Sequence, residues 1–401
     1  MNILVLQETD WLTRGPHTQH HIFETLSLNS SIKIQVLDYD MDNIMRSNSR
    51  FIKKQVYMNI HRAVQDSHVE IIRTSHLKVP YLRRFSSLIT NFFQIFKIIR
   101  NNKPDFIVGF SITNGIIGLI FSKIFKIPFI FFYIDILHQL IPLSYAQGLA
   151  RTTCQILLKN ANQVLVHTKF QQSYVINEGS KPERVIVLPD GITLKNTEVD
   201  MHKFEDLKTK FSINKDDFII FFMGYLYDFA GLQEIIDYYN NDVRSGKIKL
   251  KFVILGDGGI YNSLNNYIKK IGANWVILAG RVPFFEITEY IQLADLCLLS
   301  FRINDITKEI VPIKIFEYMA MKKPVLSNSL PSVVLELKNN SDVIFSKNLD
   351  DLIKKIGDLI GKKHELKQIG QQGYEFVKKN YAWPILINRF KKIIIDVMKR
   401  A

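Results

Sequence analysis

Two glutamates near residue 310 have the residue type and the spacing to bind a ligand rich in hydroxyl groups. The stretch KEIVPIKIFEYMAMKKPVLS, residues 308–327, reads as a turn, a short helix and a strand, with Glu309 before the helix and Glu317 inside it. Helical periodicity places these residues on one face: Ile313, Phe316, Glu317 and Ala320. A desolvated carboxylate is costly unless it is hydrogen-bonded. Glu317 therefore forms a structural salt bridge, occupies a solvated edge, or accepts hydrogen bonds from ligand hydroxyls.

The start of the same helix has the chemistry to bind a phosphate. Pro312 suits a first helical turn, where its missing N–H costs little. The first N–H groups of a helix are free to donate to an anion. Ile313 and Lys314 at this start are thus candidate phosphate-binding residues, and Lys314 adds positive charge.

Strands and helices must position these groups, and the sequence alternates between the two. Buried parallel strands read as short continuous apolar runs. In the first half such runs lie at 2–6, 33–37, 106–110, 128–134 and 163–167, and a run at 183–193 closes this part. A second series lies at 218–224, 251–258, 275–280, 295–301, 324–328 and 342–345. Helical patterns separate most of these runs, which is typical of βαβ units.

This alternation predicts an α/β protein with two doubly wound, Rossmann-like domains facing a cleft, and with ligands at the carboxyl ends of the strands. We expect residues 1–190 to form the N-terminal domain, with residues 384–401 crossing back to it. Residues 191–383 form the C-terminal domain, and a hinge lies near residue 190.

Composition narrows the class of protein. Lys and Arg outnumber Asp and Glu by 52 to 38, a net charge of +14, which predicts an anionic partner. Cys154 and Cys297 form no CxxC pattern, so neither a disulfide framework nor a zinc site is indicated, as in a reducing compartment. The N-terminus opens as a strand rather than as a signal peptide, and charged residues interrupt the most apolar region, Phe106 to Leu140. We therefore expect a cytoplasmic protein.

An ordered series of motifs resembles retaining GT-B glycosyltransferases, in particular glycosyltransferase family 4, the group 1 glycosyltransferases. Glu309 and Glu317 match its E-x7-E motif, and PIKIFEYMAMKKPVL resembles P-x-K-x-x-E-Y-x-A-x-G-x-P-V. VLPDGIT (187–193) and the block at 255–301 are similar to further family stretches. The resemblance implies that Glu309 contacts the transferred sugar and that Glu317 binds the ribose of a nucleotide sugar. It also implies an N-terminal acceptor-side domain, a C-terminal donor-binding domain, and no catalytic metal.

The loop MGYLYDFAGLQEII (223–236) departs from the family pattern. Gly224 and Gly231 are kept, but Tyr225 and Ala230 stand where the family has an Arg and a Lys that grip the donor diphosphate. Charge-assisted bonds are lost there. The candidate substitutes are Arg281, Arg302 and Lys314, while Gly256 and Gly258 are either a ligand wall or ordinary turn glycines.

Polar loops of the first half supply further candidates. In ETDWLTRGPHTQHH (8–21), Gly15 allows the backbone to approach a ligand, and Arg14 and His17 add polar groups. His20 and His21 are interpreted as structural, and a metal cluster with His17 is the disfavoured alternative. After the fourth strand, Asp135 and His138 are candidate acceptor contacts near the reacting carbon, with helix capping as the other option for Asp135. DYD (38–40) is interpreted as a strand-end loop.

The basic helix LRRFSSLITNFFQIFKIIR (82–100) is crowded with Phe, Leu and Ile. It either packs on the first sheet or forms an interfacial surface for anionic lipid, which would place the protein on the inner face of the cell membrane. No recognised nucleic-acid-binding module is found, so nucleic acid is not an expected partner.

Residues and resemblance together predict a hexosyltransferase that moves a sugar from a nucleotide sugar to an acceptor hydroxyl on a glycan or a lipid-linked acceptor, without a cofactor. The resemblance implies retention at the anomeric carbon. One alternative is a non-catalytic sugar-nucleotide-binding or scaffold subunit, which Tyr225 and Ala230 favour. A sugar-nucleotide epimerase with the same fold is a weaker alternative.

Overall fold

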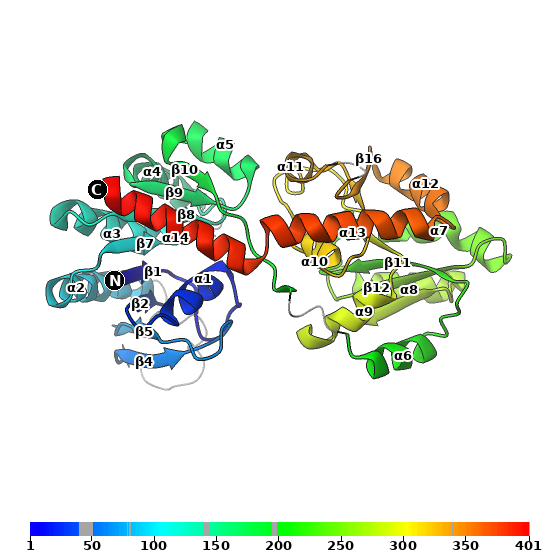
Figure 1. Cartoon of the computed structure of the whole chain (residues 1–401), viewed down its shortest axis with the longest axis horizontal. Coiled ribbons are helices and arrows are strands. Elements are labelled where there is room, and N and C mark those ends of the chain that lie inside the picture. The colour runs from blue at the N-terminus through cyan, green and yellow to red at the C-terminus, as the bar shows by residue number, and fades with distance from the viewer. Residues whose placement is uncertain are drawn as a thin grey trace. The chain divides into compact units, whose positions relative to one another are not determined.

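The computed structural model describes residues 1–39, 51–77, 79, 82–138, 144–194, 199–338 and 341–400. The chain divides into two compact units (Figure 1). Unit 1 comprises Met1–Asp190 and Trp383–Ala401, and unit 2 comprises Gly191–Ala382. Each unit has its own sheet and its own core.

Unit 1 contains an eight-stranded sheet in the order β10-β9-β8-β7-β1-β2-β5-β4. The strands are β1 Asn2–Leu6, β2 Lys33–Asp38, β4 Gln55–Ile60, β5 Val69–Arg73, β7 Phe106–Gly109, β8 Phe129–Tyr133, β9 Gln163–Val166 and β10 Val185–Val187. All neighbours pair in parallel except β4 and β5, which pair antiparallel at the edge. A short antiparallel ribbon joins β3 Phe51–Ile52 to β6 His76–Leu77.

Helices cover both faces of this sheet. They are α1 Thr18–Ser27, α2 Leu82–Asn101, α3 Ile112–Phe125, α4 Ser144–Asn160, α5 Lys169–Asn177, the 3-10 turn η1 Pro182–Arg184, and α14 Trp383–Arg400. Alternate residues of a strand point to opposite faces. Ile3 and Val5 accordingly join a core with residues of α1 and α14, whereas Leu4 and Leu6 join a core with residues of α2, α3 and α4. Figure 1 shows α14, the last helix of the chain, lying along unit 1.

Unit 2 has a six-stranded, wholly parallel sheet in the order β13-β12-β11-β14-β15-β16. Its strands are β11 Phe218–Met223, β12 Leu250–Leu255, β13 Val276–Gly280, β14 Leu296–Leu299, β15 Val325–Asn328 and β16 Ile344–Ser346. Its helices are α6 Met201–Lys210, α7 Leu232–Arg244, α8 Tyr261–Ile271, α9 Ile287–Leu293, α10 Lys314–Ala320, α11 Pro331–Glu336, α12 Leu349–Leu359 and α13 Lys363–Asn380, with 3-10 turns η3 Asp228–Ala230 and η4 Phe284–Glu286.

The strand order identifies where each sheet can hold a ligand. In unit 2 the chain runs outward from β11 in both directions, through β12 on one side and β14 on the other. In unit 1 the same reversal falls between β1 and β7. Open parallel sheets bind ligands outside the carboxyl ends of the strands at such switch points. The prediction of two Rossmann-like α/β domains is confirmed, while the buried parallel strand β5, the antiparallel edge strand β4 and the β3–β6 ribbon were not predicted.

A buried ion network closes the edge of unit 1 where β1, β2 and β5 end. The Arg73 guanidinium donates to Asp38 Oδ2 from Nε at 2.9 Å and from Nη2 at 2.8 Å, and it also contacts Asp10. The Trp11 backbone N–H donates to Asp38 at 3.1 Å. Burial raises the pKa of Asp38 to about 6, although Arg73 opposes the rise. Asp38, the first residue of the DYD stretch, is therefore a structural anchor, and Asp40 lies outside the described residues.

Replacing Arg73 by Met should lower the free energy of unfolding by about 3–5 kcal/mol, because it leaves two buried carboxylates without their cation. Lys33→Met is the matched control on the same sheet, since the exposed Lys33 lies 3.8 Å from the half-buried Glu70, and the loss of such a partly exposed pair costs about 1 kcal/mol or less. Urea denaturation of both variants measures the difference. Equal losses for the two variants would show that the Arg73 network does not stabilise this edge.

Candidate functional site

The carboxyl edge of the unit 2 sheet gathers the donor-site candidates around the end of β11. Tyr318 of α10 is fully buried, and its hydroxyl accepts a hydrogen bond from the Met223 backbone N–H at 2.9 Å. This bond fixes α10 against the residue that precedes Gly224. A strand end and a helix that are 95 residues apart in the sequence are thereby held together.

Lys314 lies across Gly224. A Cβ atom at Gly224 would stand 2.5 Å from Lys314 Nζ, and the Gly224 φ angle is +127°, so glycine suits this position on two grounds. The Lys314 ammonium lies 4.5 Å from the centroid of the Phe222 ring and 4.7 Å from that of Phe301. Burial lowers the pKa of Lys314 to about 8, and only the charge of Glu317 opposes that shift. Lys314 is therefore a desolvated cation that a bound anion would stabilise.

Glu317 follows Lys314 by one helical turn on α10. Burial raises its pKa, while the Lys314 charge lowers it. The two groups thus compensate each other's desolvation in part. Two interpretations of Glu317 are compatible with this geometry. Lys314 is its electrostatic partner, as in a structural ion pair, and the carboxylate lies beside the candidate donor position, as in ligand binding.

Two N–H groups at the start of α10 donate within the turn. The Ile315 N–H donates to the Pro312 carbonyl at 3.2 Å, and the Phe316 N–H donates to the Ile313 carbonyl at 2.9 Å. These two donors are already satisfied within the turn, so Lys314 is the group here best placed to bind a phosphate. Ile313 itself is an exposed residue rather than part of the buried stripe, because α10 begins only at Lys314.

Two glycines at neighbouring strand ends pack backbone against backbone. Gly256, after β12, has φ +138°, and a Cβ there would lie 2.0 Å from the Gly224 carbonyl oxygen. Its N–H donates to Gly280 at 2.8 Å. A Cβ at Gly258 would lie 2.5 Å from the Leu226 N atom. Gly256 and Gly258 therefore have a packing role, because they allow the loops after β11 and β12 to pack closely, and this role alone explains their residue type.

The other candidate substitutes for the missing cations have different surroundings. Arg302, after β14, forms an ion pair with Glu234, which neutralises much of its charge. Arg281 is exposed and directly follows Gly280 at the end of β13. Ala230, where the resembling family has a lysine, is fully buried. Lys314 is thus the candidate cation that the structure places against Gly224.

Glu309 lies in the turn between β14 and α10, where its N–H donates to the Ile306 carbonyl at 3.3 Å. Its side chain is half-buried. The pKa of the adjacent Lys308 is raised mainly by the hydrogen bond and the charge of Asp305, and to a smaller extent by the charge of Glu309. Glu309 and Glu317 both belong to the segment that runs from β14 into α10.

Sequence reasoning missed an aromatic row beside Gly224. Ring centroids are 4.5 Å apart for Tyr225 and Tyr227, 4.6 Å for Tyr227 and Phe229, and 5.2 Å for Phe229 and Phe301. Tyr225 is 55% exposed and forms the outer end of the row. The alternation Y-x-Y-x-F at 225–229 is the sequence signal that could have indicated it.

In unit 1, the loop after β1 is held from within. The His20 Nδ1 accepts from the His17 backbone N–H at 3.0 Å, and Nε2 contacts the Trp11 carbonyl at 3.0 Å. Burial lowers the pKa of His20 to about 4, so the ring is neutral at pH 7. Gly15 has φ +85°, and a Cβ there would lie 2.6 Å from the His17 N atom. Gly15 therefore shapes a tight loop, and His20 supports it.

A polar cluster at the carboxyl ends of β9 and β10 was also missed. His167 Nδ1 lies 3.2 Å from Asp190 Oδ2, and the Thr18 hydroxyl donates to the other Asp190 oxygen. Burial raises the pKa of Asp190, but His167, Thr18 and His17 together bring it below its usual range. Thr18 and Asp190 are 172 positions apart, which is why no local pattern indicated the cluster.

Asp135 and His138, the acceptor-side candidates, follow β8. Asp135 is exposed, and its Oδ1 accepts from the Ile136 N–H at 2.8 Å. His138 is buried, which lowers its pKa, although Glu178 acts in the opposite direction. Within the described residues, no group of three or more His, Cys, Asp or Glu could hold a metal ion.

Comparison with known proteins agrees with this architecture. Residues 203–376 match the family Glycosyl transferases group 1. An uncharacterised glycosyltransferase of Methanocaldococcus jannaschii is 24% identical over 324 residues, covering 79% of this chain and 83% of the relative. The N,N'-diacetylbacillosaminyl-diphospho-undecaprenol alpha-1,3-N-acetylgalactosaminyltransferase of Campylobacter jejuni is 24% identical over 317 residues, covering 74% and 80%.

Among solved structures, HepE of Anabaena in complex with UDP superposes with a TM-score of 0.71 at 15% identity, covering 99% of this chain and 100% of HepE. That likeness establishes the fold. The chain therefore has the GT-B fold, residues 203–376 of unit 2 match the group 1 glycosyltransferases, and the related sequences are those of glycosyltransferases.

Proposed function

We propose that the protein transfers a hexose from a nucleoside diphosphate sugar to a hydroxyl group of a lipid-linked glycan, with retention at the anomeric carbon. The observation that carries this proposal is the half-buried Lys314 ammonium beside Gly224, at the switch point of the unit 2 sheet. An anion at that place regains the charge pairing that burial removed. The structural neighbour HepE holds UDP, and the Campylobacter jejuni relative by its name uses a diphospho-undecaprenol acceptor.

In this proposal, Lys314 binds the donor diphosphate, and the bound phosphate keeps the lysine protonated above its unliganded pKa of about 8. Glu317 accepts hydrogen bonds from the ribose, and Glu309 orients the sugar. The exposed ring of Tyr225 offers a stacking surface at the position where the family loop has a cation. Asp135 and His138 contact the acceptor from unit 1.

The reaction requires the acceptor hydroxyl to form a bond to the anomeric carbon as the bond from that carbon to the phosphate oxygen breaks. The hydroxyl proton passes to an oxygen of the departing phosphate, and the nucleoside diphosphate leaves. Lys314 stabilises the negative charge that develops on the leaving group, in a site where water is largely displaced. The proposed chemistry uses the donor itself and requires no cofactor.

A non-catalytic nucleotide-sugar-binding subunit is the second candidate, favoured by Tyr225 and by the buried Ala230 in place of two cations. The two proposals separate in one measurement. A catalytic protein that binds a nucleotide sugar releases nucleoside diphosphate when an acceptor, or slowly water, is present. A binding subunit is stabilised against heat by the same nucleotide sugar and releases none.

Glu317→Ala should weaken nucleotide binding while the fold stays intact. Losing hydrogen bonds from the ribose to a carboxylate costs about 1.5–3 kcal/mol. Calorimetric titration with UDP, and with any other nucleotide that binds the wild type, measures the loss. Unchanged affinity for every such nucleotide would refute the ribose assignment.

Glu309→Gln should reduce turnover more than nucleotide affinity, because the proposal places this side chain against the sugar rather than against the nucleoside. The amide keeps the shape and removes the negative charge near the reacting carbon. Initial rates on the identified donor are compared with the affinity for the free nucleoside diphosphate. Wild-type turnover in this variant would leave Glu309 with a structural role only.

The membrane proposal depends on α2, whose apolar side chains are largely outside the core. The exposed members are Leu82, Phe85, Ile89, Phe92, Phe93 and Phe96, and Ile120 and Ile124 of the neighbouring α3 are exposed as well. The alternative in which this helix only packs on the first sheet does not account for Phe85 and Phe93, each 64% exposed. Within the described residues, no helix has the length and apolar character to cross a bilayer.

Basic residues frame this apolar surface, though not all of them are equally available. Arg84 lies 3.3 Å from Glu8, and the Arg83 guanidinium lies 4.9 Å from the Tyr39 ring centroid. Lys97 and Arg100 lie at the other end of α2. Each basic group near an anionic surface contributes about 1 kcal/mol at most, so we propose that the apolar side chains and these charges act together at the inner face of the membrane.

Phe85→Ser combined with Phe93→Ser should abolish flotation with anionic liposomes while thermal stability is kept, because both rings are exposed. Phe285→Ser is the matched control, since Phe285 is an exposed phenylalanine of unit 2. Wild-type flotation should weaken as salt rises, because the Debye length falls from about 10 Å at 0.1 M to about 3 Å at 1 M. Wild-type protein that ignores anionic liposomes at low salt would end the membrane proposal.

A further inference from the structure

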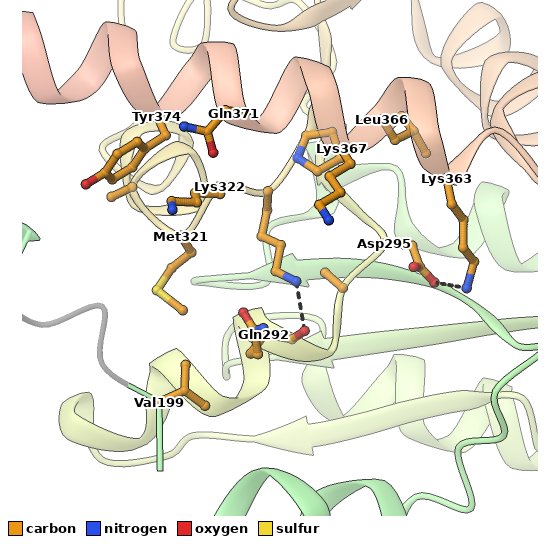
Figure 2. A pocket seen from close by; sticks show the side chains of 14 residues that line it. Val199, Gln292, Asp295, Met321, Lys322, Lys363, Leu366, Lys367, Gln371 and Tyr374 are labelled. Carbon is orange, nitrogen blue, oxygen red and sulfur yellow. Dashed lines mark hydrogen bonds and ion pairs between the residues drawn. The ribbon is translucent and has the colours of Figure 1, made fainter. Parts of the chain in front are cut away.

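A basic hollow opens in unit 2 at the end of the sheet away from the candidate donor site (Figure 2). Its cavity volume is about 610 Å³. Among the described residues that line it, one is a carboxylate, Asp295, and four are lysines: Lys322, Lys323, Lys363 and Lys367. A cavity of this size holds a small organic molecule.

The hollow lies at the amino ends of β14 and β15. Ala294 and Asp295 directly precede β14, and residues 320–324 lead from the end of α10 into β15. Gly224 and Lys314, in contrast, lie at the carboxyl edge of the same sheet. None of the proposed donor-binding residues lines the hollow, so it is a separate feature of unit 2.

The lysines supply more positive charge than the protein neutralises. Lys363 pairs with Asp295 at 3.2 Å, and Lys323 donates to the Gln292 carbonyl at 2.9 Å. Lys322 Nζ lies 4.9 Å from the Tyr374 ring centroid. Among the described residues, no ion pair involves Lys322 or Lys367. Figure 2 shows the Lys363 side chain reaching Asp295, the Lys367 side chain extending from the same helix, α13, and Lys322 beside Tyr374.

Lys322 occupies a backbone conformation that side chains usually avoid. Its φ angle is +57°, in the left-handed region where glycine is favoured. The family pattern that this stretch resembles has glycine at that position. Glycine would remove this backbone strain, so a lysine at this position points to a function for its side chain. Placing an ammonium group at the rim of a basic hollow is such a function.

The walls of the hollow are closely fitted. A Cβ atom on Gly370 of α13 would lie 2.2 Å from the Lys322 carbonyl oxygen, so α13 contacts the 320–324 segment backbone against backbone. This contact holds the lysines of α13 and the lysine of the segment at a fixed spacing. Met321, Leu366 and Tyr374 provide an apolar part of the lining.

We propose that this hollow binds a small molecule that carries two or more phosphate groups, either a free phosphorylated compound or the headgroup of a lipid. Among the described residues, Lys322 and Lys367 have no ion-pair partner, whereas Lys363 pairs with Asp295 and Lys323 donates to a carbonyl. This amount of positive charge matches a ligand with more than one phosphate group. Ammonium groups donate charge-assisted hydrogen bonds to phosphate oxygens. The apolar lining contacts an organic part of the ligand.

The test is calorimetric titration of the full chain with inorganic pyrophosphate at low salt. Lys322→Gly combined with Lys367→Ala should weaken binding at least tenfold. Because Lys322→Gly removes the left-handed strain, the variant should melt no lower than the wild type. The control is Lys269→Ala with Lys270→Ala, two exposed lysines in the last turn of α8, which should bind as the wild type does.

A second variant, Lys314→Ala, distinguishes pyrophosphate binding in the hollow from binding at the carboxyl edge. It should retain the binding that the variant Lys322→Gly with Lys367→Ala, here called the pocket variant, loses. Equal affinity in the wild type and the pocket variant, or an equal loss in the Lys269 and Lys270 control, overturns the proposal. Flotation with vesicles containing a phosphoinositide bisphosphate distinguishes the sources. Flotation that the pocket variant alone loses assigns a lipid headgroup, and pyrophosphate binding without such flotation assigns a free compound.

Discussion

A desolvated ammonium group organises the carboxyl edge of unit 2. Lys314 lies against two aromatic rings and over Gly224, so it has lost water without gaining a full ion pair. Such a group is tolerated only if neighbours offset its desolvation. Glu317 does so in part from the next turn of the same helix. Glycine suits residue 224 because its φ angle is +127° and because a Cβ there would meet the lysine ammonium, while the Tyr318 bond to Met223 holds strand and helix together.

The wound topology explains why these groups meet. Parallel strands need crossover connections, and each crossover returns the chain so that all carboxyl ends lie at one edge. In the order β12-β11-β14, the end of β11 lies between two loops that run in opposite directions across the sheet. Gly224 follows β11, Phe301 follows β14, and α10 is the next helix after β14. The same logic in unit 1 places the Gly15 loop after β1, beside the β1–β7 reversal.

The sequence predicted the two Rossmann-like domains because fully buried parallel strands are unbroken apolar runs, as in β11, FIIFFM. It missed β4, QVYMNI, because an edge strand mostly exposed to solvent shows no such run. For the site, local spacing indicated Lys314 and Glu317. It could not indicate that Arg302 pairs with Glu234, 68 positions away, or that Thr18 and His167 share Asp190. Such pairings depend on which strand ends become neighbours, and a single sequence does not contain that information locally.

The excess positive charge does not form one uniform surface. The basic side chains lie in different surroundings, in which solvent screens their charge to different extents. Lys97 and Arg100 lie at the end of the solvent-facing helix α2, where salt screens their charge within about 8–10 Å. Lys314 is half-buried and desolvated enough to lower its pKa, so salt screens its interaction with an anion less. The lysines around the hollow near Tyr374 lie between these cases, since Lys323 is desolvated enough for burial to lower its pKa, whereas Lys322 is exposed. Anions bound at the three places should therefore respond differently to ionic strength. Salt dependence separates a membrane contact from a buried phosphate contact in a way that the net charge of +14 cannot.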